Sequence, residues 1–161
     1  MIVAGCDVGS RFGKVVVMSN GDVLGHSIVR ASIASEETSQ MAMDEALEGL
    51  DVELNDIDYI VCTGYGRLRV PFAQETVSEL ACIAMGAHSI NPKARTVIDV
   101  GGQDAKVVKV TESGGVKDFI LNDKCASGTG RFVEDIARVL EVTMEDMGSL
   151  VEGGGDFIVI E

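Results

Sequence analysis

The hydrophobic positions along the chain group into short apolar runs separated by glycine-rich turns. Residues 2–6, 14–18 and 23–29 each form such a run, and runs of this length are typical of β-strands. Asn20-Gly21 stands between the second and third runs, and this dipeptide favours a two-residue hairpin. The start of the chain therefore predicts an antiparallel meander of three strands.

The same pattern occurs a second time, 92 positions further along the chain. Residues 96–98, 105–110 and 116–121 form three more strand-sized apolar runs. The sequence Asp-Val-Gly-Ser-Arg-Phe-Gly-Lys-Val-Val at 7–16 returns as Asp-Val-Gly-Gly-Gln-Asp-Ala-Lys-Val-Val at 99–108, with aspartate, glycine, lysine and both final valines in register. This repeat predicts a second meander that begins with the same kind of glycine turn.

Helical patterns follow the strands. Ser35 precedes acidic residues and a run with helical spacing, so we expect it to cap a helix. Thr76 and Glu79 have the spacing of a capping box before a second helix, and residues 128–140 form a third helical pattern. Residues 57–62 are a further apolar run that predicts a strand. The chain is therefore predicted to be of the α/β class.

The repeat also predicts how the chain is organised. Asn91-Pro92 favours a boundary, so we expect a first lobe over residues 1–92 and the beginning of a second lobe over residues 93–161. Two lobes that each start with a meander and an Asp-Gly turn resemble the duplicated ribonuclease H-like lobes of the actin, sugar-kinase and chaperone ATPase fold. On this resemblance the second lobe is incomplete.

The charge balance argues against a nucleic-acid or anionic-membrane partner. The chain has 13 basic and 26 acidic residues, for a net charge of −13, whereas binding to phosphate-rich surfaces needs a basic patch. The longest apolar runs are strand-sized, and no basic segment precedes the first one. We therefore expect a cytoplasmic protein in which Cys6, Cys62 and Cys82 are buried free thiols.

The two glycine turns have the chemistry of a phosphate site. Gly9 in the first turn and Gly101 in the second leave backbone N–H groups open to a phosphate. Asp7 and Asp99 end the preceding strands, and their carboxylates can hold Mg²⁺, which bridges to phosphate oxygens. The pair of turns predicts a clamp around a triphosphate. The alternative is two ordinary hairpins whose glycines serve only the turns.

Other side chains near these turns are candidates for binding or catalysis. Lys14 and Lys106 follow their turns, where each either reaches phosphate or is a surface lysine on a strand. Gln103 and Asp104 could orient or deprotonate a water at the terminal phosphate. Glu79 is another catalytic candidate, although a helix-capping role would also explain it.

Cys125 differs from the other cysteines because it lies on a glycine-rich turn directly before a predicted helix. A thiolate at a helix N-terminus is stabilised by the helix dipole and by free N–H groups, which suits it to metal ligation. The alternative is that residues 127–130 form an ordinary helix cap and that the thiol is incidental. One cysteine cannot hold a metal by itself, so spacing alone leaves both interpretations open.

The segment around this cysteine, Asn-Asp-Lys-Cys-Ala-Ser-Gly-Thr-Gly-Arg-Phe at 122–132, resembles a motif of the ATPases that activate 2-hydroxyacyl-CoA dehydratases and of the ATPase subunits of benzoyl-CoA reductase. Four other segments match that family in the family's order: Asp-Val-Gly-Ser at 7–10, Thr-Gly-Tyr-Gly-Arg at 63–67, Ser-Glu-Leu at 78–80 and Asp-Val-Gly-Gly-Gln-Asp at 99–104. The resemblance covers roughly residues 1–150.

The resemblance implies an ATPase that binds ATP or ADP with Mg²⁺ and works as a homodimer with one shared [4Fe–4S] cluster. ATP binding or hydrolysis would change the angle between the helices that hold the cluster. One electron, taken from a low-potential donor, would then pass to an acyl-CoA dehydratase or reductase. Cys125 is implied to be a cluster ligand, and Gln103 to lie beside the attacking water. The residues implied to line the phosphates are Asp7, Gly9, Ser10, Asp99, Gly101 and Gly102.

The end of the chain departs from the family. Residues 152–161 do not resemble the family. Members of the family have a second ligand cysteine, a glycine-rich adenosine motif and closing helices further downstream. We therefore expect either a fragment or a different ending, and two thiolates per dimer fall short of the four ligands that such a cluster normally takes. The predicted function is an ATP-binding reductive activator. The alternatives are a small-molecule kinase of the same fold and an inactive, truncated ATPase lobe.

Overall fold

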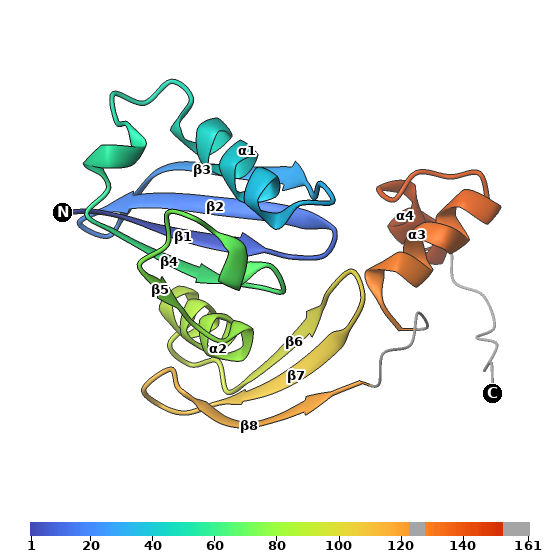
Figure 1. The fold of residues 1–161 in the computed structure, drawn as a ribbon. Helices are drawn as coiled ribbons and strands as arrows, with labels where there is room; N and C mark the ends of the chain where they lie inside the picture. The colour runs from blue at the N-terminus through green and yellow to red at the C-terminus, as the bar shows by residue number, and fades with distance from the viewer. Residues whose placement is uncertain (123–127, 153–161) are drawn as a thin grey trace. The chain divides into compact units, whose positions relative to one another are not determined.

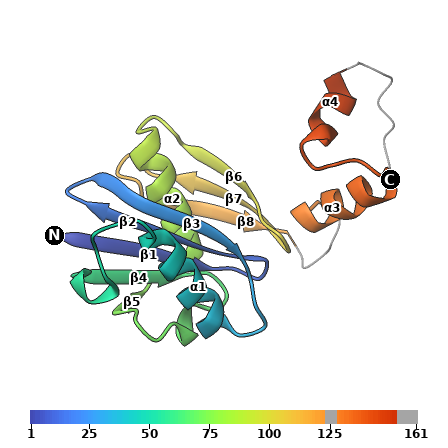
Figure 2. The ribbon, with the colours of Figure 1, turned by 90° about the horizontal axis from the view of Figure 1, so that it is seen from above.

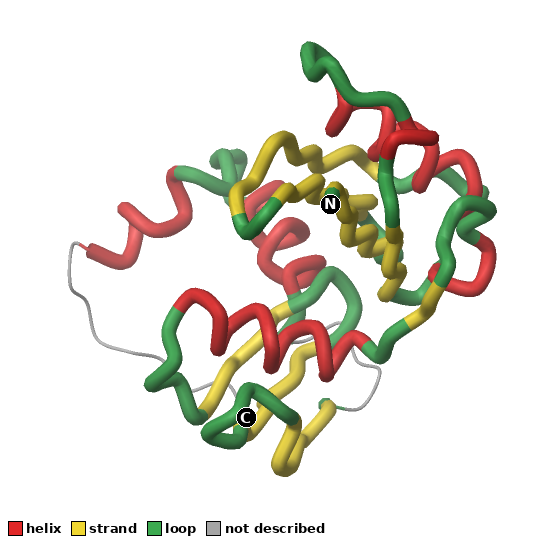
Figure 3. Tube along the Cα trace, turned by 90° about the vertical axis from the view of Figure 1, so that its left-hand side faces the viewer, coloured by secondary structure: helices red, strands yellow, loops and turns green. Residues whose placement is uncertain are grey.

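The computed structural model describes residues 1–122 and 128–152, and Figure 3 distinguishes their helices, strands and loops by colour. The chain divides into two compact units. The first contains residues 1–97 and 108–119, and the second contains residues 98–107 with the described residues from 120 onward. The lobe boundary expected at residue 92 was defined by the internal repeat rather than by compactness, so it stays a prediction.

A five-stranded sheet forms the centre of the first unit, with strand order β3-β2-β1-β4-β5 (Figure 1). Its strands are β1 (Ile2–Val8), β2 (Phe12–Ser19), β3 (Asp22–Arg30), β4 (Tyr59–Thr63) and β5 (Glu75–Thr76). The first three strands pair antiparallel, which confirms the predicted meander, and β4 pairs parallel to β1. Asn20 and Gly21 both have positive φ, 53° and 95°, as the two-residue hairpin turn requires.

Helix α1 (Ser35–Leu47) lies across strands β1, β2 and β3 of this sheet (Figures 1 and 2). Its residues Ala42, Met43 and Ala46 are buried in the same apolar core as Val15 and Val17. The prediction that Ser35 caps this helix is wrong. The N-cap is Ala34, which makes no side-chain capping bond, and Ser35 already lies in the first helical turn.

Helix α2 (Glu79–Ile90) packs on part of a second sheet of order β6-β7-β8. The strands are β6 (Thr96–Val100), β7 (Ala105–Val110) and β8 (Val116–Leu121), which confirms the second meander. Ala84, Val108 and Val110 are buried at this contact. The predicted capping box of Thr76 and Glu79 is wrong, because Thr76 belongs to β5 and Ser78 caps the helix by accepting a bond from Ala81 N–H.

The remaining described elements are short. They are the 3₁₀ turns η1 (Leu54–Asp56) and η2 (Arg67–Arg69), and the helices α3 (Gly130–Val139) and α4 (Asp146–Glu152). Helix α3 confirms the third predicted helix. Among the described residues, no helix has the length and apolar character needed to cross a membrane. Cys6 and Cys62 are buried free thiols as predicted, whereas Cys82 is only half-buried.

Candidate functional site

The first glycine turn connects β1 to β2 and carries a paired aspartate. Gly9 N–H donates to Phe12 O over 3.0 Å, which closes the turn. A Cβ on Gly9 would lie 3.0 Å from the same oxygen, so a larger residue would crowd the turn. Asp7 lies opposite Lys14 in the antiparallel register, and Lys14 Nζ donates to Asp7 Oδ2 over 2.8 Å.

The second glycine turn, between β6 and β7, repeats this arrangement within the second unit. Gly101 N–H donates to Asp104 O over 2.8 Å. Lys106 Nζ lies 3.4 Å from Asp99 Oδ2 and 2.7 Å from Asp104 Oδ1. A backbone bond of 2.9 Å from Gly130 N–H to Gly101 O joins this turn to the start of α3.

The two turns are equivalent bond by bond. The donor and acceptor of the closing hydrogen bond, Gly9 and Phe12, become Gly101 and Asp104 after the same shift of 92 positions that relates the two sequences. The lysine–aspartate pair shifts by the same interval. The internal repeat therefore extends from sequence to backbone geometry and to ion pairing.

The lysines differ in their surroundings. The Lys14 side chain is 49% exposed, whereas that of Lys106 is only 5% exposed. Lys106 is thus a buried cation held by carboxylates, which rules out the alternative of a surface lysine for this position. A buried ammonium is stable only beside compensating charge, and the Asp104 carboxylate supplies that charge to Lys106. Gln103, by contrast, is exposed.

A third segment, the Thr-Gly-Tyr-Gly-Arg motif at 63–67, lies against the first turn. Thr63 pairs with Asp7 in the parallel register of β4 and β1. Gly64 follows with φ of +87°, and a Cβ there would lie 2.4 Å from Asp7 Oδ1. Gly66 N–H donates to Val8 O over 2.8 Å, which holds the segment against the end of β1. The glycines of the Thr-Gly-Tyr-Gly motif were the available signal for this close approach.

Glu79 lies near the same edge of the sheet as Asp7. β4 runs parallel to β1 and β5 parallel to β4, so their carboxyl ends meet at one edge. Val77 N–H donates to Cys62 O over 2.8 Å, which places the start of α2 just beyond that edge. Glu79 is half-buried in the first turn of α2. It therefore remains a candidate for catalysis.

Three other predicted site residues have these positions. Ser10 is exposed at the first turn, and Gly102 is half-buried at the second. Cys125 lies outside the described residues. Within residues 1–122 and 128–152, no three His, Cys, Asp or Glu side chains gather as a set that could hold a metal ion without other ligands. A cation at either turn would need phosphate or water to complete its coordination.

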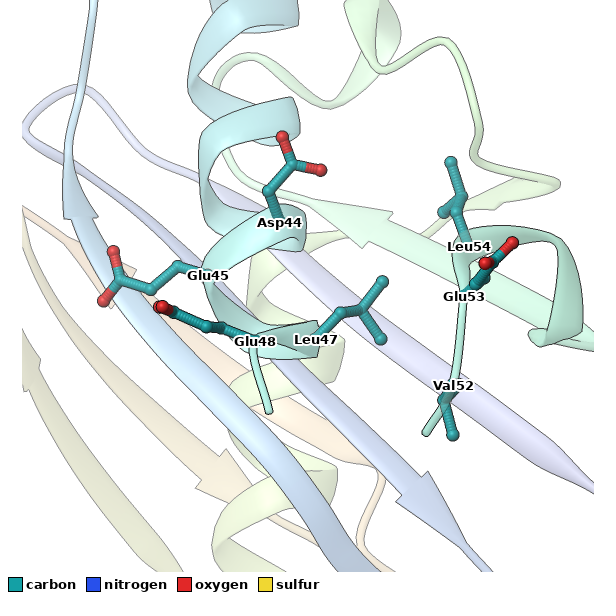
Figure 4. Close-up of a pocket in the computed structure, with 7 residues that line it drawn as sticks. All are labelled: Asp44, Glu45, Leu47, Glu48, Val52, Glu53 and Leu54. Atoms are coloured by element: carbon teal, nitrogen blue, oxygen red, sulfur yellow. The ribbon is translucent and has the colours of Figure 1, made fainter. Parts of the chain in front are cut away.

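A hollow of about 680 Å³ opens elsewhere on the first unit, between the end of α1 and the segment before η1 (Figure 4). Its lining is Asp44, Glu45, Leu47, Glu48, Val52, Glu53 and Leu54. Asp58, which follows η1, donates its N–H to Ile2 O, so the chain just after the hollow meets the start of β1, the opposite end from Asp7. Four of these lining residues carry carboxylates, which would repel phosphate. The hollow is therefore less suited than the turns to bind phosphate.

Comparison with known proteins identifies relatives. A model of the BadF/BadG/BcrA/BcrD ATPase family matches residues 4–155. The activator of lactoyl-CoA dehydratase from Anaerotignum propionicum is 44% identical over 157 residues, which cover 97% of this chain and 60% of that protein. The (R)-2-hydroxyglutaryl-CoA dehydratase activating ATPase from Acidaminococcus fermentans is 40% identical over 148 residues, which cover 91% of this chain and 56% of that protein.

Solved structures agree in fold. The component A of (R)-2-hydroxyglutaryl-CoA dehydratase from Acidaminococcus fermentans has a TM-score of 0.91 at 36% identity, and the match covers 99% of this chain and 62% of that one. The activator of 2-hydroxyisocaproyl-CoA dehydratase from Clostridium difficile with bound ADPNP has a TM-score of 0.90 at 35% identity, covering 98% and 59%. A ROK hexokinase from Thermus thermophilus, at 12% identity and a TM-score of 0.55, shares the fold alone.

These matches confirm the predicted fold class. The chain has the α/β architecture of the N-terminal part of the activator structures, an actin-like ATPase fold. It spans 56 to 60% of the length of the two curated relatives described above.

Proposed function

The chain belongs to the BadF/BadG/BcrA/BcrD ATPase family, and on that premise we propose that it binds the phosphates of Mg-ATP as part of an activator of an acyl-CoA dehydratase or reductase. Its relatives at about 40% identity are named activators of 2-hydroxyacyl-CoA dehydratases. The related activator from Clostridium difficile binds ADPNP. Nucleotide binding is therefore the property to test first.

The observation that carries the proposal is the recurrence of one turn geometry in two places. Each turn has a glycine N–H closing a tight bend, a carboxylate at the end of the preceding strand and a lysine paired with it. An ordinary hairpin needs the glycine and gains from a cross-strand charge pair, but it does not require the same aspartate and lysine in both turns. Phosphate binding with a divalent cation uses the carboxylate and the lysine, and the glycine keeps the turn free of a side chain.

The roles of individual residues follow from their positions. Ser10 and Gly102 would offer hydroxyl and backbone donors to the phosphates, while Gly9 and Gly101, whose N–H groups close their turns, would let the phosphates approach without a side chain in the way. Asp7 and Asp99 would hold Mg²⁺, which when bound neutralises phosphate charge. Asp7 Oδ1 suits this role because it is buried and no described residue donates a hydrogen bond to it. Lys14 is exposed enough to turn from Asp7 toward a phosphate, whereas Lys106 is held between two carboxylates.

Hydrolysis needs a group that orients or deprotonates water. Gln103 is exposed beside Gly102, so we assign it the positioning of the attacking water. Asp104 forms an ion pair with Lys106, with 2.7 Å between Asp104 Oδ1 and Lys106 Nζ. We therefore assign it the role of stabilising the second turn. Glu79, near the carboxyl edge of β1, is the remaining carboxylate to act as a base.

The redox part of the proposal rests on the motif around Cys125 and on family membership. Cys125 would ligate a [4Fe–4S] cluster shared by two copies of the chain, and the cluster when bound supplies single electrons. The partners would be a low-potential donor and an acyl-CoA dehydratase or reductase. Nucleotide binding at the turns is independent of this part and can be tested without it.

Calorimetric titration with Mg-ADPNP tests the nucleotide proposal. Asp7→Ala and Asp99→Ala should each weaken binding by about tenfold or more, because each removes a carboxylate from the proposed cation site. Asp22→Ala is the matched control, since Asp22 is an exposed aspartate at the start of β3. If both Asp7→Ala and Asp99→Ala bind Mg-ADPNP with wild-type affinity, the two turns do not form the nucleotide site.

A further inference from the structure

Asp7 and Thr63 occupy paired positions on the neighbouring parallel strands β1 and β4. Each has a buried side-chain oxygen, Asp7 Oδ1 and Thr63 Oγ1, for which the described residues supply no hydrogen-bond partner. Thr63 is 9% exposed as a whole. Two neighbouring residues of the sheet thus each carry such an oxygen, at the turn proposed to bind phosphate.

Such a pair is costly for the folded protein. A hydroxyl or carboxylate removed from water loses its hydrogen bonds, and folded proteins satisfy nearly all such groups. Exceptions are concentrated where a ligand or an ordered water completes the bonding. The two oxygens therefore indicate a place where something binds.

The two oxygens of Asp7 have different surroundings. Oδ2 accepts a hydrogen bond of 2.8 Å from Lys14 Nζ. Oδ1 faces Gly64, where a Cβ would come within 2.4 Å. Asp7 therefore presents Oδ1, rather than the lysine-bound Oδ2, on the side of Gly64.

We propose that Thr63 is a positioning residue for Asp7, whose hydroxyl binds one water of the hydrated Mg²⁺ that Asp7 Oδ1 also holds. A hydroxyl can donate to one partner and accept from another, so a single water can satisfy both oxygens. Mg²⁺ keeps several waters when it binds to proteins. This inference rests on the proposed function, because it assigns a further residue to the same cation site.

Two variants at position 63 and one control at position 76 separate this role from a merely structural one. Thr63→Val keeps the shape and removes the hydroxyl, Thr63→Ser keeps the hydroxyl, and Thr76→Val changes an exposed threonine on neighbouring β5. Calorimetry with ADP, once with Mg²⁺ and once with a chelator, measures how much the cation contributes to affinity. Urea unfolding without nucleotide measures stability.

Thr63→Val should lose about tenfold of the Mg²⁺-dependent gain in affinity, with ADP affinity in chelator unchanged. Thr63→Ser and Thr76→Val should bind as wild type does. Without nucleotide, Thr63→Val should be at least as stable as wild type, because it removes a buried hydroxyl that makes no bond. A purely structural hydroxyl would instead lower stability when removed.

The outcomes that overturn the inference are distinct from those that overturn the proposed function. Wild-type protein that binds no Mg-ADP would end both. Wild-type binding with an unchanged Mg²⁺ dependence in Thr63→Val would end the role of Thr63 alone. Failure of Thr63→Ser to restore binding would show that the hydroxyl is not the group that matters. A loss of stability in Thr63→Val would show that the hydroxyl is bonded within the protein.

Discussion

Lys14 donates to Asp7 across the β1–β2 pair, with Lys14 Nζ 2.8 Å from Asp7 Oδ2. The equivalent pair in the second turn, Lys106 and Asp99, is longer at 3.4 Å, and Lys106 makes its shorter contact with Asp104. One sequence pattern has thus produced an exposed pair in the first turn and a buried cation in the second. The two pairs should respond differently to mutation.

Asp104→Asn should lower the free energy of unfolding by about 1–3 kcal/mol, because it removes the nearest carboxylate from a buried ammonium. Asp7→Asn breaks a pair whose lysine is 49% exposed, so its cost should stay below about 1 kcal/mol. Urea unfolding followed by circular dichroism at pH 7 gives both values. Equal losses in the two variants would contradict the difference in burial.

Gly64 is the glycine whose replacement should do most damage to the first turn. Its φ is +87°, and a Cβ would lie 2.4 Å from Asp7 Oδ1 and 2.6 Å from Val8 O. Gly64→Ala therefore combines left-handed strain with a clash, for an expected loss of about 2–4 kcal/mol in unfolding free energy. It should also weaken Mg-nucleotide binding, because the clash displaces Asp7.

Gly49→Ala is the control for that experiment. Gly49 has a similar φ of +78°, but nothing lies within 4 Å of the Cβ that alanine would add. Its cost should be the strain alone, about 1–2 kcal/mol, with nucleotide affinity unchanged. Thermal or urea unfolding of the two variants side by side separates strain from contact. Equal losses would mean that the approach of Gly64 to Asp7 has no energetic consequence.

Local features of the fold were predictable from the sequence. The strands at 105–110 and 116–121 have the bounds that their apolar runs predicted. The turn at Asn20-Gly21 formed as expected, because its geometry depends on two residues with positive φ. The equivalence of the two turns was visible as the repeat. These features depend on neighbours in the chain, which pattern reasoning can use.

Features that depend on distant segments were harder to predict. The pairing of Thr63 with Asp7 follows from the register of two parallel strands far apart in sequence, which no local pattern sets. The burial of Lys106 did have a signal. It alternates with Val108 and Val110, both buried, and so lies on the inner face of β7. The capping box failed because Thr76 pairs in a strand instead.

The thiols of Cys6 and Cys62 should be protected in the folded protein. The two residues pair in the register of β1 and β4, and both are buried. A hydrogen bond with Cys62, burial and the nearby charge of Asp7 raise the pKa of the Cys6 thiol. Cys6 is therefore neutral at pH 8, where a free cysteine is partly thiolate.

Iodoacetamide at pH 8 should accordingly alkylate half-buried Cys82 well before Cys6, since only the thiolate reacts and the reagent must reach it. After unfolding in urea, Cys6 and Cys82 should react alike. Peptide mass spectrometry assigns the modified residues. Alkylation of Cys6 in the folded protein as fast as that of Cys82 would show that β1 and β4 open readily.

The redox part of the proposed function makes Cys125 the thiol on which iron uptake depends. Protein reconstituted without oxygen, with iron, sulfide and an external thiol to fill the remaining positions, should take up both elements, because thiolates are the usual ligands of such clusters. Cys125→Ser should lose this uptake, while Cys82→Ser, a change at a half-buried cysteine of α2, should keep it.

The affinity for Mg-ADPNP should stay at the wild-type value in both variants, because the turns of Asp7 and Asp99 are unchanged. Iron and sulfide analysis with an absorbance spectrum measures the first effect, and calorimetry measures the second. Full iron and sulfide in Cys125→Ser would mean that Cys125 is no ligand, and the electron-transfer role would fall while nucleotide binding stood.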